Sequence, residues 1–426
     1  MLKAYKIRCY PTLAQRLAFA RTEGATRYVR NRVLREMDAF HQATGGYKSV
    51  VEMSREVTQW KRDPDTSWLA DIPSDPIAQE LRDLDAGFKA FFAKRAKYPK
   101  KKRKLFGCAV RFVFDQRHSG KVRAWLDRSL ILPKLGQIKL AQPDRLPVQM
   151  PKLVTLSRDG AGRFFVAFAV ELASEALPAT GHEVGVDLGI KALAVVSDGR
   201  FFDGAKSLRG KLRHLKRLQR GLSRKVGARK GERKSNRYLR QARRVGRLHA
   251  KIADTRRDVQ HKATTAIVRS ADVIALEDLN VAGMLKNGKL ALHIADGGLA
   301  EVRRQIEYKA NWYGRTVVYA DRWAPTSRTC SGCGQVHDMP LSKRRMVCDC
   351  GADLDRDLNA ARNILSMSTG EKSGIKARGA GKNLSEEGSG RPEAPAVKRE
   401  PRANLTHDSP NQGQGHGSAR QERAVA

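Results

Sequence analysis

The sequence is short of acidic side chains and has no long apolar run. It holds 44 Asp and Glu against 82 Lys and Arg, which gives this chain of 426 residues a formal net charge of +38. A net charge of this size says little about the fold, but it predicts that the protein binds a polyanion. The longest strongly apolar runs, such as Phe164 to Val170, are far too short to span a bilayer, and no signal-peptide pattern opens the chain. We therefore expect a cytoplasmic, nucleoid-associated protein that does not contact membranes.

Cysteine is also scarce. The chain has six cysteines, and four of them fall between residues 330 and 350. So few and so clustered cysteines exclude a small scaffold stapled by disulfides. Cys9 and Cys108, outside the cluster, are expected to be ordinary buried thiols. The length instead predicts two to four domains, with enough apolar material for buried cores.

Apolar periodicity divides the first 178 residues into two modules. A half-buried strand is predicted at the start, and helical patterns follow from the capping box Thr12-Leu-Ala-Gln15. From residue 109 the period changes to two, which predicts a row of short strands. We therefore expect a small β-barrel or sandwich, formed by residues 1–10 and 105–178, that is interrupted by a helical module of residues 11–104. The strands are expected at 3–9, 109–114, 122–126, 130–132, 138–140, 153–156 and 164–170.

Positive charge is concentrated in two places. A cationic run from Lys94 to Lys104 ends the helical module, and 23 Lys or Arg against three acidic residues lie between Lys206 and Ser270. The second stretch carries +20 of the net charge, and its apolar residues recur at helical spacing, which predicts two amphipathic helices with basic outer faces. So many like charges on one element repel each other unless a polyanion neutralises them. Contact with nucleic acid is favoured at both places over a solvated surface.

Three of the acidic side chains stand at the edges of regular elements. The stretch Glu183-Val-Gly-Val-Asp187-Leu-Gly predicts a strand that ends on Asp187, where two glycines let the backbone turn into a second strand. A later apolar run ends in Glu277, and Asp357 opens the helical pattern 358–365. If the two strands are neighbours and the helix packs across them, the three carboxylates meet at one point. Carboxylates held together repel one another unless a cation bridges them, so Mg²⁺, or Mn²⁺ in its place, is the expected occupant.

This constellation is interpreted as a nuclease centre, because two such ions roughly 3.5–4 Å apart are the usual device for in-line phosphodiester cleavage. Each residue also has a simpler explanation. Asp187 could cap a turn, Glu277 could lie on the surface after its strand, and either Asp355 or Asp357 could be the N-cap of the helix.

The element order of the second half suits an α/β domain of the RNase H-like type. Three strands are followed by the basic helices, a strand, a helix, a strand and a final helix. Between residues 280 and 298 we expect a flexible loop, which is either a gate over the scissile strand or a plain surface loop. Residues 371–426 are rich in Gly, Ser, Pro, Lys and Glu and are expected to be disordered.

The clustered cysteines form two close pairs, Cys330-Ser-Gly-Cys333 and Cys348-Asp-Cys350, each followed by glycine. Four thiolates in this arrangement predict a structural Zn²⁺ ribbon, which lies in sequence between Glu277 and Asp357. The second pair has a spacer of one residue in place of the usual two, which shortens its knuckle and makes His337 a conceivable substitute ligand. The alternative is four unligated thiols in a reducing cytosol.

These motifs, in this order, resemble the TnpB (OrfB) family encoded by insertion sequences, over roughly residues 1 to 370. The resemblance implies an RNA-guided DNA endonuclease related to the type V CRISPR effectors. Such a protein pairs a transposon-end guide RNA with double-stranded target DNA, cuts it with a RuvC-like centre, and requires a short motif beside the target. The resemblance is carried by Lys3-Ala-Tyr-Lys-Ile-Arg-Cys-Tyr-Pro11, Gly185-Val-Asp187-Leu-Gly189, Leu276-Glu277-Asp278-Leu279, Tyr319-Ala-Asp-Arg-Trp-Ala-Pro-Thr-Ser327 and Asp355-Arg-Asp357-Leu-Asn-Ala-Ala-Arg-Asn-Ile364.

Carried over by position, the resemblance assigns roles to individual residues. Asp357 is chosen over Asp355 because it directly precedes Leu-Asn-Ala-Ala, as the ligand does in the family's pattern. The barrel becomes a wedge domain and the helices a recognition module, which would hold the guide duplex and read the adjacent motif. The RuvC-like nuclease domain is assigned to 179–325 and 353–370, and the zinc ribbon to 326–352. The implied catalytic magnesium ligands are Asp187, Glu277 and Asp357, and the implied zinc ligands are Cys330, Cys333, Cys348 and Cys350.

Two other functions fit the same sequence. One is a transposase that joins DNA ends with the same acidic triad, since such enzymes share the RNase H-like fold. The other is a non-catalytic regulator of the element, in which the ribbon and the basic helices bind nucleic acid and the metal centre is idle.

Overall fold

The computed structural model of the protein describes residues 2–103, 107–114, 129–142, 146–147, 151–173, 176–225, 234–340 and 342–370. The strand expected at 122–126 and the tail expected to be disordered at 371–426 lie outside the described residues. None of the helices in these ranges is both long and apolar enough to cross a membrane.

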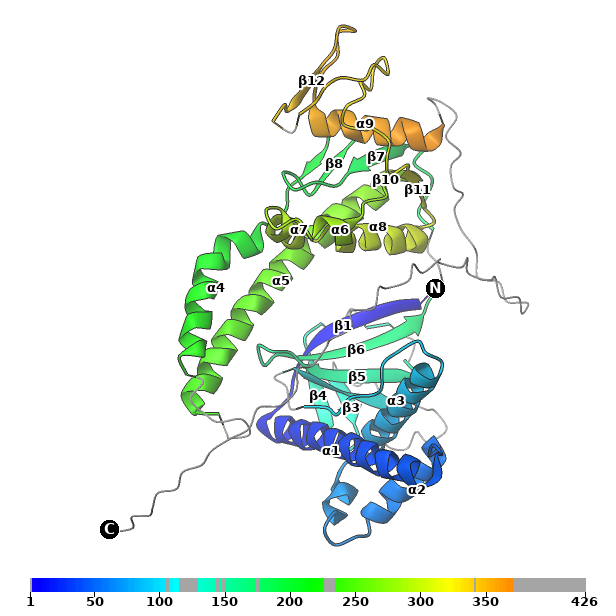
Figure 1. Ribbon diagram of the computed structural model, residues 1–426, viewed down its shortest axis with the longest axis vertical. Helices are drawn as coiled ribbons and strands as arrows, with labels where there is room; N and C mark the ends of the chain where they lie inside the picture. The colour runs from blue at the N-terminus through cyan, green and yellow to red at the C-terminus, as the bar shows by residue number, and fades with distance from the viewer. Residues whose placement is uncertain are drawn as a thin grey trace, which may run out of the picture. The chain divides into compact units, whose positions relative to one another are not determined.

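Six antiparallel strands form the first sheet, which is a half-barrel (Figure 1). They are β1 (Leu2–Tyr10), β2 (Cys108–Val113), β3 (Ser129–Leu132), β4 (Gly136–Leu140), β5 (Leu153–Arg158) and β6 (Phe164–Glu171). The N-terminal strand β1 pairs with β6 on one side and with β4 on the other, so it completes the sheet as expected. The described strands pair in the open order β2-β5-β6-β1-β4-β3. A sheet was therefore predicted correctly, but these pairings do not close it into a full barrel.

Between β1 and β2 the chain forms helices with an apolar core of their own. They are α1 (Leu13–Thr44), α2 (Val50–Trp60), the short 3₁₀ helix η1 (Ser67–Asp71) and α3 (Ser74–Phe92). The predicted capping box at Thr12 and Gln15 is present and begins α1. Phe19 of α1 enters the core of the half-barrel, where its ring lies 5.3 Å from that of Phe164. The helix that leaves the sheet is therefore also fixed to it.

The second sheet has five strands in the order β11-β10-β7-β8-β9. They are β7 (Glu183–Asp187), β8 (Ala194–Val196), β9 (Phe201–Phe202), β10 (Val273–Glu277) and β11 (Thr316–Ala320). β7, β10 and β11 run parallel, whereas β8 and β9 are antiparallel to their neighbours. The carboxyl ends of the three parallel strands therefore lie at one edge. The α/β class predicted for this half of the chain is confirmed.

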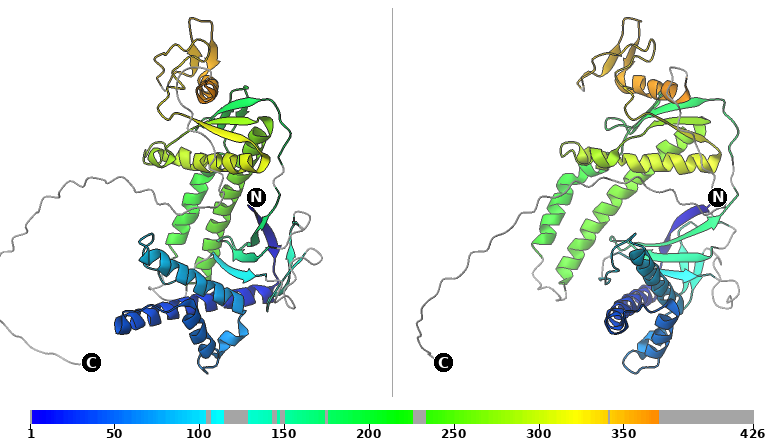
Figure 2. Two further views of the ribbon diagram at one scale, coloured as in Figure 1. Left: turned by 90° about the vertical axis from the view of Figure 1, so that its right-hand side faces the viewer. Right: turned by 45° about the vertical axis from the view of Figure 1, so that its right-hand side comes forward.

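Helices cover both faces of the second sheet (Figure 2). They are α5 (Asn236–Ser270) and α8 (Leu299–Tyr313) on one face and α9 (Arg356–Thr369) on the other. Alternation along the strands produces this arrangement, because successive side chains point to opposite faces. In β10, Ile274 and Leu276 join the core with α5 and α8, while Ala275 between them packs with Ile364 of α9.

Gly185, in the middle of β7, lets α9 lie close to the sheet. A Cβ at this position would stand 2.0 Å from the carbonyl oxygen of Ala361 and 2.8 Å from the amide nitrogen of Leu365. Gly185 therefore serves helix–strand packing, and the expectation that it helps the backbone turn is wrong. Asp357 precedes Ala361 by one helical turn, so this contact also fixes the start of α9 relative to β7.

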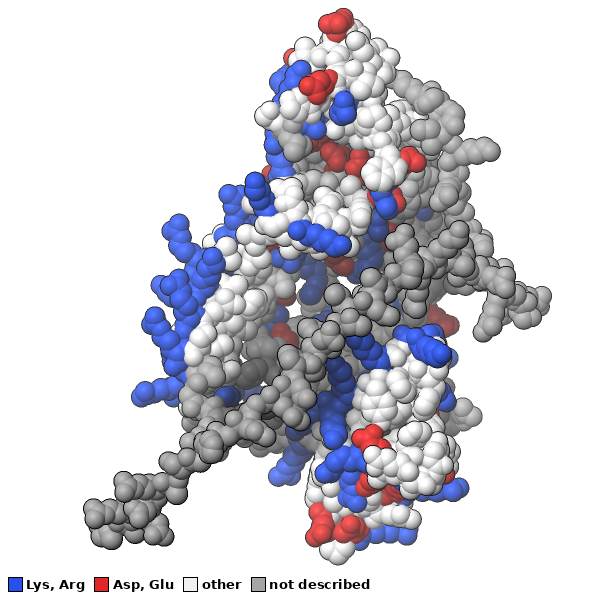
Figure 3. Space-filling model, in the orientation of Figure 1, with Lys and Arg blue, Asp and Glu red and all other residues white. Residues whose placement is uncertain are grey.

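The two basic helices are present as predicted. α4 (Ser207–Ser223) packs against α5 through a small apolar seam that includes Leu215, Leu248 and Ile252. Lys and Arg side chains gather along the edge formed by α4 (Figure 3). The apolar stripe is thus used for packing, and the basic residues are left at the surface.

The segment between residues 280 and 298, expected to be a flexible loop, is largely helical. It forms α6 (Val281–Met284) and α7 (Ala291–Gly297). Asp296, which is buried, accepts hydrogen bonds from the backbone amides of Leu208 and Arg209 at 3.0 and 3.1 Å and pairs with Arg256. The amide bonds hold the pKa of Asp296 below its usual value although burial acts to raise it. This carboxylate caps α4, so the segment is fastened to the basic helices.

We predict that Gly185→Ala destabilises the packing of α9 on β7, because the new methyl group would overlap backbone atoms that cannot move aside. Overpacking of this kind costs about 1–3 kcal/mol. Hydrogen exchange of the α9 amides, followed by mass spectrometry, should accelerate. Gly210→Ala is the control, because a Cβ there meets nothing within 4 Å. Unchanged exchange in α9 of the Gly185→Ala protein would contradict the packing role.

Candidate active site and cysteine cluster

Asp187 and Glu277 end two adjacent parallel strands. β7 and β10 pair in register up to Val186 and Leu276. The next residue of each strand is therefore acidic, and both carboxylates project from the same edge of the sheet.

Asp357 lies in the first turn of α9, where the helix dipole also favours a negative charge. The helix is capped by Asp355, whose carboxylate accepts a hydrogen bond of 2.9 Å from the amide of Asp357. The other oxygen of Asp355 lies 3.1 Å from Nζ of Lys191. Asp355 is therefore engaged as the N-cap, one of the two roles considered for it, and Asp357 remains as the candidate ligand.

Glu277 and Asp357 lie near enough to Asp187 to influence its ionisation. Burial, and after it the charges of Glu277 and Asp357, raise the pKa of Asp187 to about 8, while Arg356 acts in the opposite direction. Three negative charges at this edge therefore favour either a bound proton or a cation.

The spacing of the carboxylates is wider than that of ligands around a single small ion. Within the described ranges, only the four clustered cysteines bring three or more ligand atoms within 4.8 Å of one another. Asp187, Glu277 and Asp357 do not form so compact a set.

Glu277 is held by a residue that the sequence did not single out. Oγ1 of Thr326 donates a hydrogen bond of 2.6 Å to Oε1 of Glu277. The carbonyl oxygen of Thr326 in turn accepts a bond of 2.8 Å from Nδ2 of Asn363, on α9. The helix that carries Asp357 therefore also positions the side chain that holds Glu277. The signal available in the sequence was two asparagines, Asn359 and Asn363, one helical turn apart, and only the three-dimensional contacts give them meaning.

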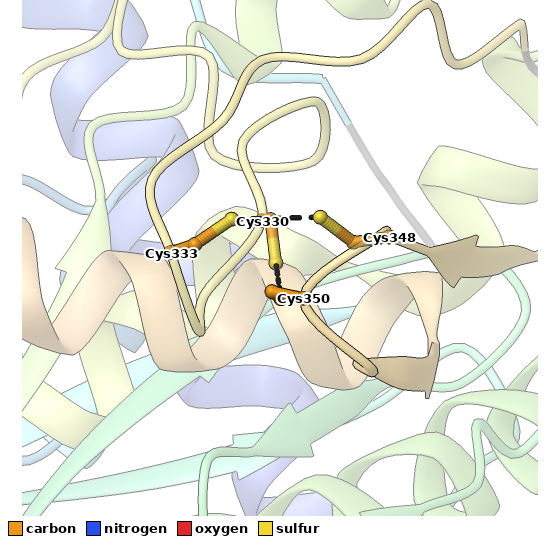
Figure 4. A group of neighbouring side chains, drawn as sticks. All are labelled: Cys330, Cys333, Cys348 and Cys350. Atoms are coloured by element: carbon orange, nitrogen blue, oxygen red, sulfur yellow. Dashed lines mark hydrogen bonds between the residues drawn. The ribbon is translucent and has the colours of Figure 1, made fainter.

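The four clustered cysteines converge on one point (Figure 4). The sulfur atoms of Cys333 and Cys348 are 3.4 Å apart, and those of Cys330 and Cys350 are 3.7 Å apart. Tetrahedral zinc with sulfur ligands at about 2.3 Å requires sulfur–sulfur distances of about 3.8 Å. The spacer of one residue between Cys348 and Cys350 thus still permits a closed set of four, and no histidine belongs to this set.

The environment of Cys330 favours the thiolate that a metal requires. Burial opposes ionisation, but the backbone amides of Cys333 and Gly332 outweigh it and lower the pKa of Cys330 to about 7. The apolar core around the cluster is very small, since its buried members are Cys330, Met339, Met346 and Cys348. The cysteines are therefore half of that core. The short strands β12 (Arg345–Val347) and β13 (Asp353–Asp355) complete the unit.

The cysteine unit is fastened to α9 by buried polar side chains. Asn359 accepts a hydrogen bond of 2.8 Å from the amide of Ser331, between the first two cysteines, and donates one of 2.7 Å to the carbonyl of Thr329. Arg356 reaches the carbonyl of Pro340 at 2.9 Å and the hydroxyl of Ser327 at 3.2 Å. The cysteine cluster and the candidate acidic site thus share one supporting helix.

Three family profiles match the chain. "Probable transposase" matches residues 166–288, "Cas12f1-like, TNB domain" matches residues 300–364, and "Helix-turn-helix domain" matches residues 1–46. Residues 2–46 hold β1 and the single continuous helix α1, so the name of the third profile does not describe the structure of this segment.

Two curated relatives match over most of their length. A protein of Streptomyces pristinaespiralis named "Putative RNA-guided DNA endonuclease" is 38% identical over 369 residues, which cover 85% of this chain and 89% of that protein. "Putative RNA-guided DNA endonuclease InsQ" of Escherichia coli (strain K12) is 34% identical over 387 residues, covering 86% and 92%. The chain therefore belongs to the TnpB (OrfB) family of RNA-guided DNA endonucleases, as the sequence motifs predicted.

One solved structure has a comparable fold over nearly its whole length. It is titled "Cryo-EM structure of the Cas12f1-sgRNA-target DNA complex", and it matches with a TM-score of 0.50 over 85% of this chain and 98% of that chain, at 12% identity. This likeness supports the assignment of the fold, which combines an α/β part with a half-barrel sheet.

We predict that removal of metal from the cysteine cluster unfolds the unit around it, since little apolar core remains to hold it. Zinc content should fall from about one ion per chain to near zero in Cys333→Ser, and amide exchange should accelerate between residues 326 and 355. Cys108→Ser, outside the cluster, is the control and should keep the metal. A Cys333→Ser protein with full zinc content and unchanged exchange would contradict a four-cysteine site.

Proposed function

We propose that this protein is an RNA-guided DNA endonuclease of a transposable element, and that it cuts with divalent cations held by Asp187, Glu277 and Asp357. The observation that supports the proposal is the raised pKa of Asp187 on β7, to which the charges of Glu277 on β10 and Asp357 on α9 contribute after burial. A cluster of this kind is otherwise unfavourable, because like charges in a partly buried place repel each other.

The second sheet supports a RuvC-like, RNase H-like assignment. In the order β11-β10-β7-β8-β9, three parallel strands are followed by two antiparallel ones. Asp187 and Glu277 stand at the carboxyl ends of the parallel neighbours β7 and β10. Bound divalent cations would supply charge neutralisation at the phosphate and activation of a water molecule. The chain itself orients the carboxylates, through the register of β7 with β10, the close packing at Gly185 and the hydroxyl of Thr326.

The zinc ribbon assignment rests on the chemistry of its donors. Four sulfur atoms at near-tetrahedral separations, with backbone amides directed at Cys330, fit Zn²⁺. We assign residues 326–352 to this ribbon and 179–325 with 353–370 to the nuclease domain. Residues 1–10 and 105–178 would form the wedge domain and 11–104 the recognition module.

Guide RNA from the transposon end and double-stranded target DNA are the proposed partners. In RNA-guided recognition, base pairing reads the sequence, while the protein holds the heteroduplex by its backbone and reads a short adjacent motif. The excess of positive charge on α4 and α5 suits such backbone contacts.

We predict that the protein, purified with its co-bound RNA, cuts a matching duplex in the presence of Mg²⁺ and that Asp187→Ala abolishes cutting without weakening duplex binding. Loss of an essential metal ligand lowers the rate by orders of magnitude. Asp198→Ala is the matched control, because Asp198 lies in the next turn and pairs with Arg200. Gel analysis of cleaved and bound DNA measures both effects.

Two results would overturn this assignment. If the Asp187→Ala protein cut DNA at the parental rate, the assignment of the three carboxylates as catalytic metal ligands would be wrong. Strand-transfer products formed without RNA would instead favour a transposase, to which the name of the first family profile corresponds.

We predict that replacing basic residues on α4 with glutamine reduces the salt dependence of duplex binding. Each lost phosphate contact changes the slope of log affinity against log salt by about 0.9. The affinity is measured by fluorescence anisotropy between about 50 and 200 mM salt. The replaced residues, all exposed, are Arg213, Lys216, Arg217 and Arg220.

A control protein loses the same number of charges elsewhere and should keep the parental slope. Its replaced side chains already pair with neighbouring carboxylates, and they are Lys48, Arg200, Arg304 and Arg345. Equal slopes in the two variants would argue that α4 does not contact the phosphate backbone.

A further inference from the structure

Trp323 is the most exposed large apolar side chain among the described residues. It is 86% exposed, whereas Trp68, the next most exposed tryptophan in the described ranges, is 42% exposed and packs edge-to-face on Tyr28. Exposing a whole indole to water forgoes the free energy that burial would provide. The packing of the described residues does not explain why this side chain is exposed. We therefore expect it to bind a partner molecule.

The loop that carries Trp323 has a defined backbone. The carboxylate of Asp321 accepts a hydrogen bond of 2.8 Å from the amide of Trp323, and its carbonyl accepts one of 3.1 Å from the amide of Ala324. This turn fixes the Cα of Trp323 and directs the side chain away from the protein. The indole is therefore presented by an ordered turn.

Both ends of this loop are fastened to the candidate active site. On one side, Nε of Arg322 donates to the carbonyl of Asp278 at 3.0 Å, and the guanidinium also pairs with the carboxylate of Asp278. On the other side, Thr326 donates to Glu277. The loop that carries Trp323 is thus anchored on either side of this residue to Glu277 and to its immediate neighbour Asp278.

We propose that Trp323 is a stacking platform for an unpaired base of the DNA strand that enters the active site. This inference rests on the proposed function and adds a substrate-binding residue to it. Bases of a duplex are already stacked on both faces, so an isolated indole selects a single strand, and RNA-guided recognition displaces one DNA strand in that form. Stacking on an aromatic ring tolerates any base, because each base has a π-face.

The surroundings of Trp323 favour a nucleic acid over an apolar protein surface. The flanking exposed residues include Asp321, Arg322 and Arg328, so the indole does not belong to a continuous apolar patch. A single aromatic ring among arginines suits a base and its phosphate. A protein partner would instead require a broader apolar area to exclude water.

The test measures binding in a protein that cannot cut. The Asp187→Ala protein with its co-purified RNA is titrated with a single-stranded oligothymidylate that has no complementarity to the guide. Trp323→Ala in this background should weaken binding about tenfold, within the range of base–aromatic stacking. Trp323→Phe, which retains a ring, should restore most of the affinity. Trp68→Ala is the control for loss of an exposed tryptophan and should bind like the parent.

An abasic strand of equal length separates stacking from a general effect on the loop. It offers the same phosphates without bases, so the parent and the Trp323→Ala protein should bind it equally. Equal loss of affinity for the abasic and the base-containing strand would overturn the proposal, and so would an oligothymidylate affinity of Trp323→Ala within twofold of the parent.

The outcome is distinguishable from failure of the proposed function. If the wild-type protein cuts a guided duplex but Trp323→Ala does not alter single-strand binding, the stacking role alone is wrong. If Trp323 controls binding but the wild-type protein cuts no DNA with any guide, the nuclease assignment fails and the base platform stands. In the cutting protein, Trp323→Ala should raise KM for a single-stranded substrate about tenfold with little change in kcat, because stacking in the ground state is retained in the transition state.

Discussion

The candidate active site depends on the close contact between α9 and β7 at Gly185. Strand register alone brings Asp187 and Glu277 to one edge, but the third carboxylate, Asp357, comes from a helix 170 residues after Asp187 and 80 after Glu277. The helix reaches the strand because no Cβ separates its backbone from that of β7. The same helix carries Asn359 and Asn363, so one packing contact fixes the acidic site and the position of the cysteine unit together.

Electrostatic repulsion works against this packing. The raised pKa of Asp187 expresses first the cost of burying its ionised carboxylate and then the repulsion from Glu277 and Asp357. Apolar cores on both faces of the sheet stabilise the fold and offset this unfavourable free energy at its edge. Such local conflict between charge and burial is typical of sites where a ligand supplies the compensating interaction.

The sequence predicted the elements well, because their determinants are local. The capping box at Thr12, the period-two strands and the basic amphipathic helices all follow from the nature of adjacent residues. The three acidic positions could be selected for the same reason, since each stands where a regular element begins or ends. Local propensity did not distinguish Asp355 from Asp357, because either can cap a helix, and the choice of Asp357 rested on the family's pattern. Only the hydrogen bond from the amide of Asp357 identifies the cap.

What the sequence could not supply were contacts between distant segments. Gly185 is compatible with a turn or with close packing, and the choice depends on Ala361, far along the chain. The segment between 280 and 298 has glycines typical of a loop, but the buried carboxylate of Asp296 fastens it to α4. The spacing of Cys348 and Cys350 predicted a shortened knuckle that put the zinc site in doubt, yet the backbone still brings all four sulfur atoms together.

The central claim is that Asp187, Glu277 and Asp357 jointly hold divalent cations. Crystals of the protein with its bound RNA, grown in Mn²⁺ and measured at the manganese absorption edge, test it most directly. The account predicts anomalous density for two ions, roughly 3.5–4 Å apart, between these carboxylates. Crystals with an intact second sheet and saturating Mn²⁺, but no anomalous density at the ends of β7 and β10, would contradict it.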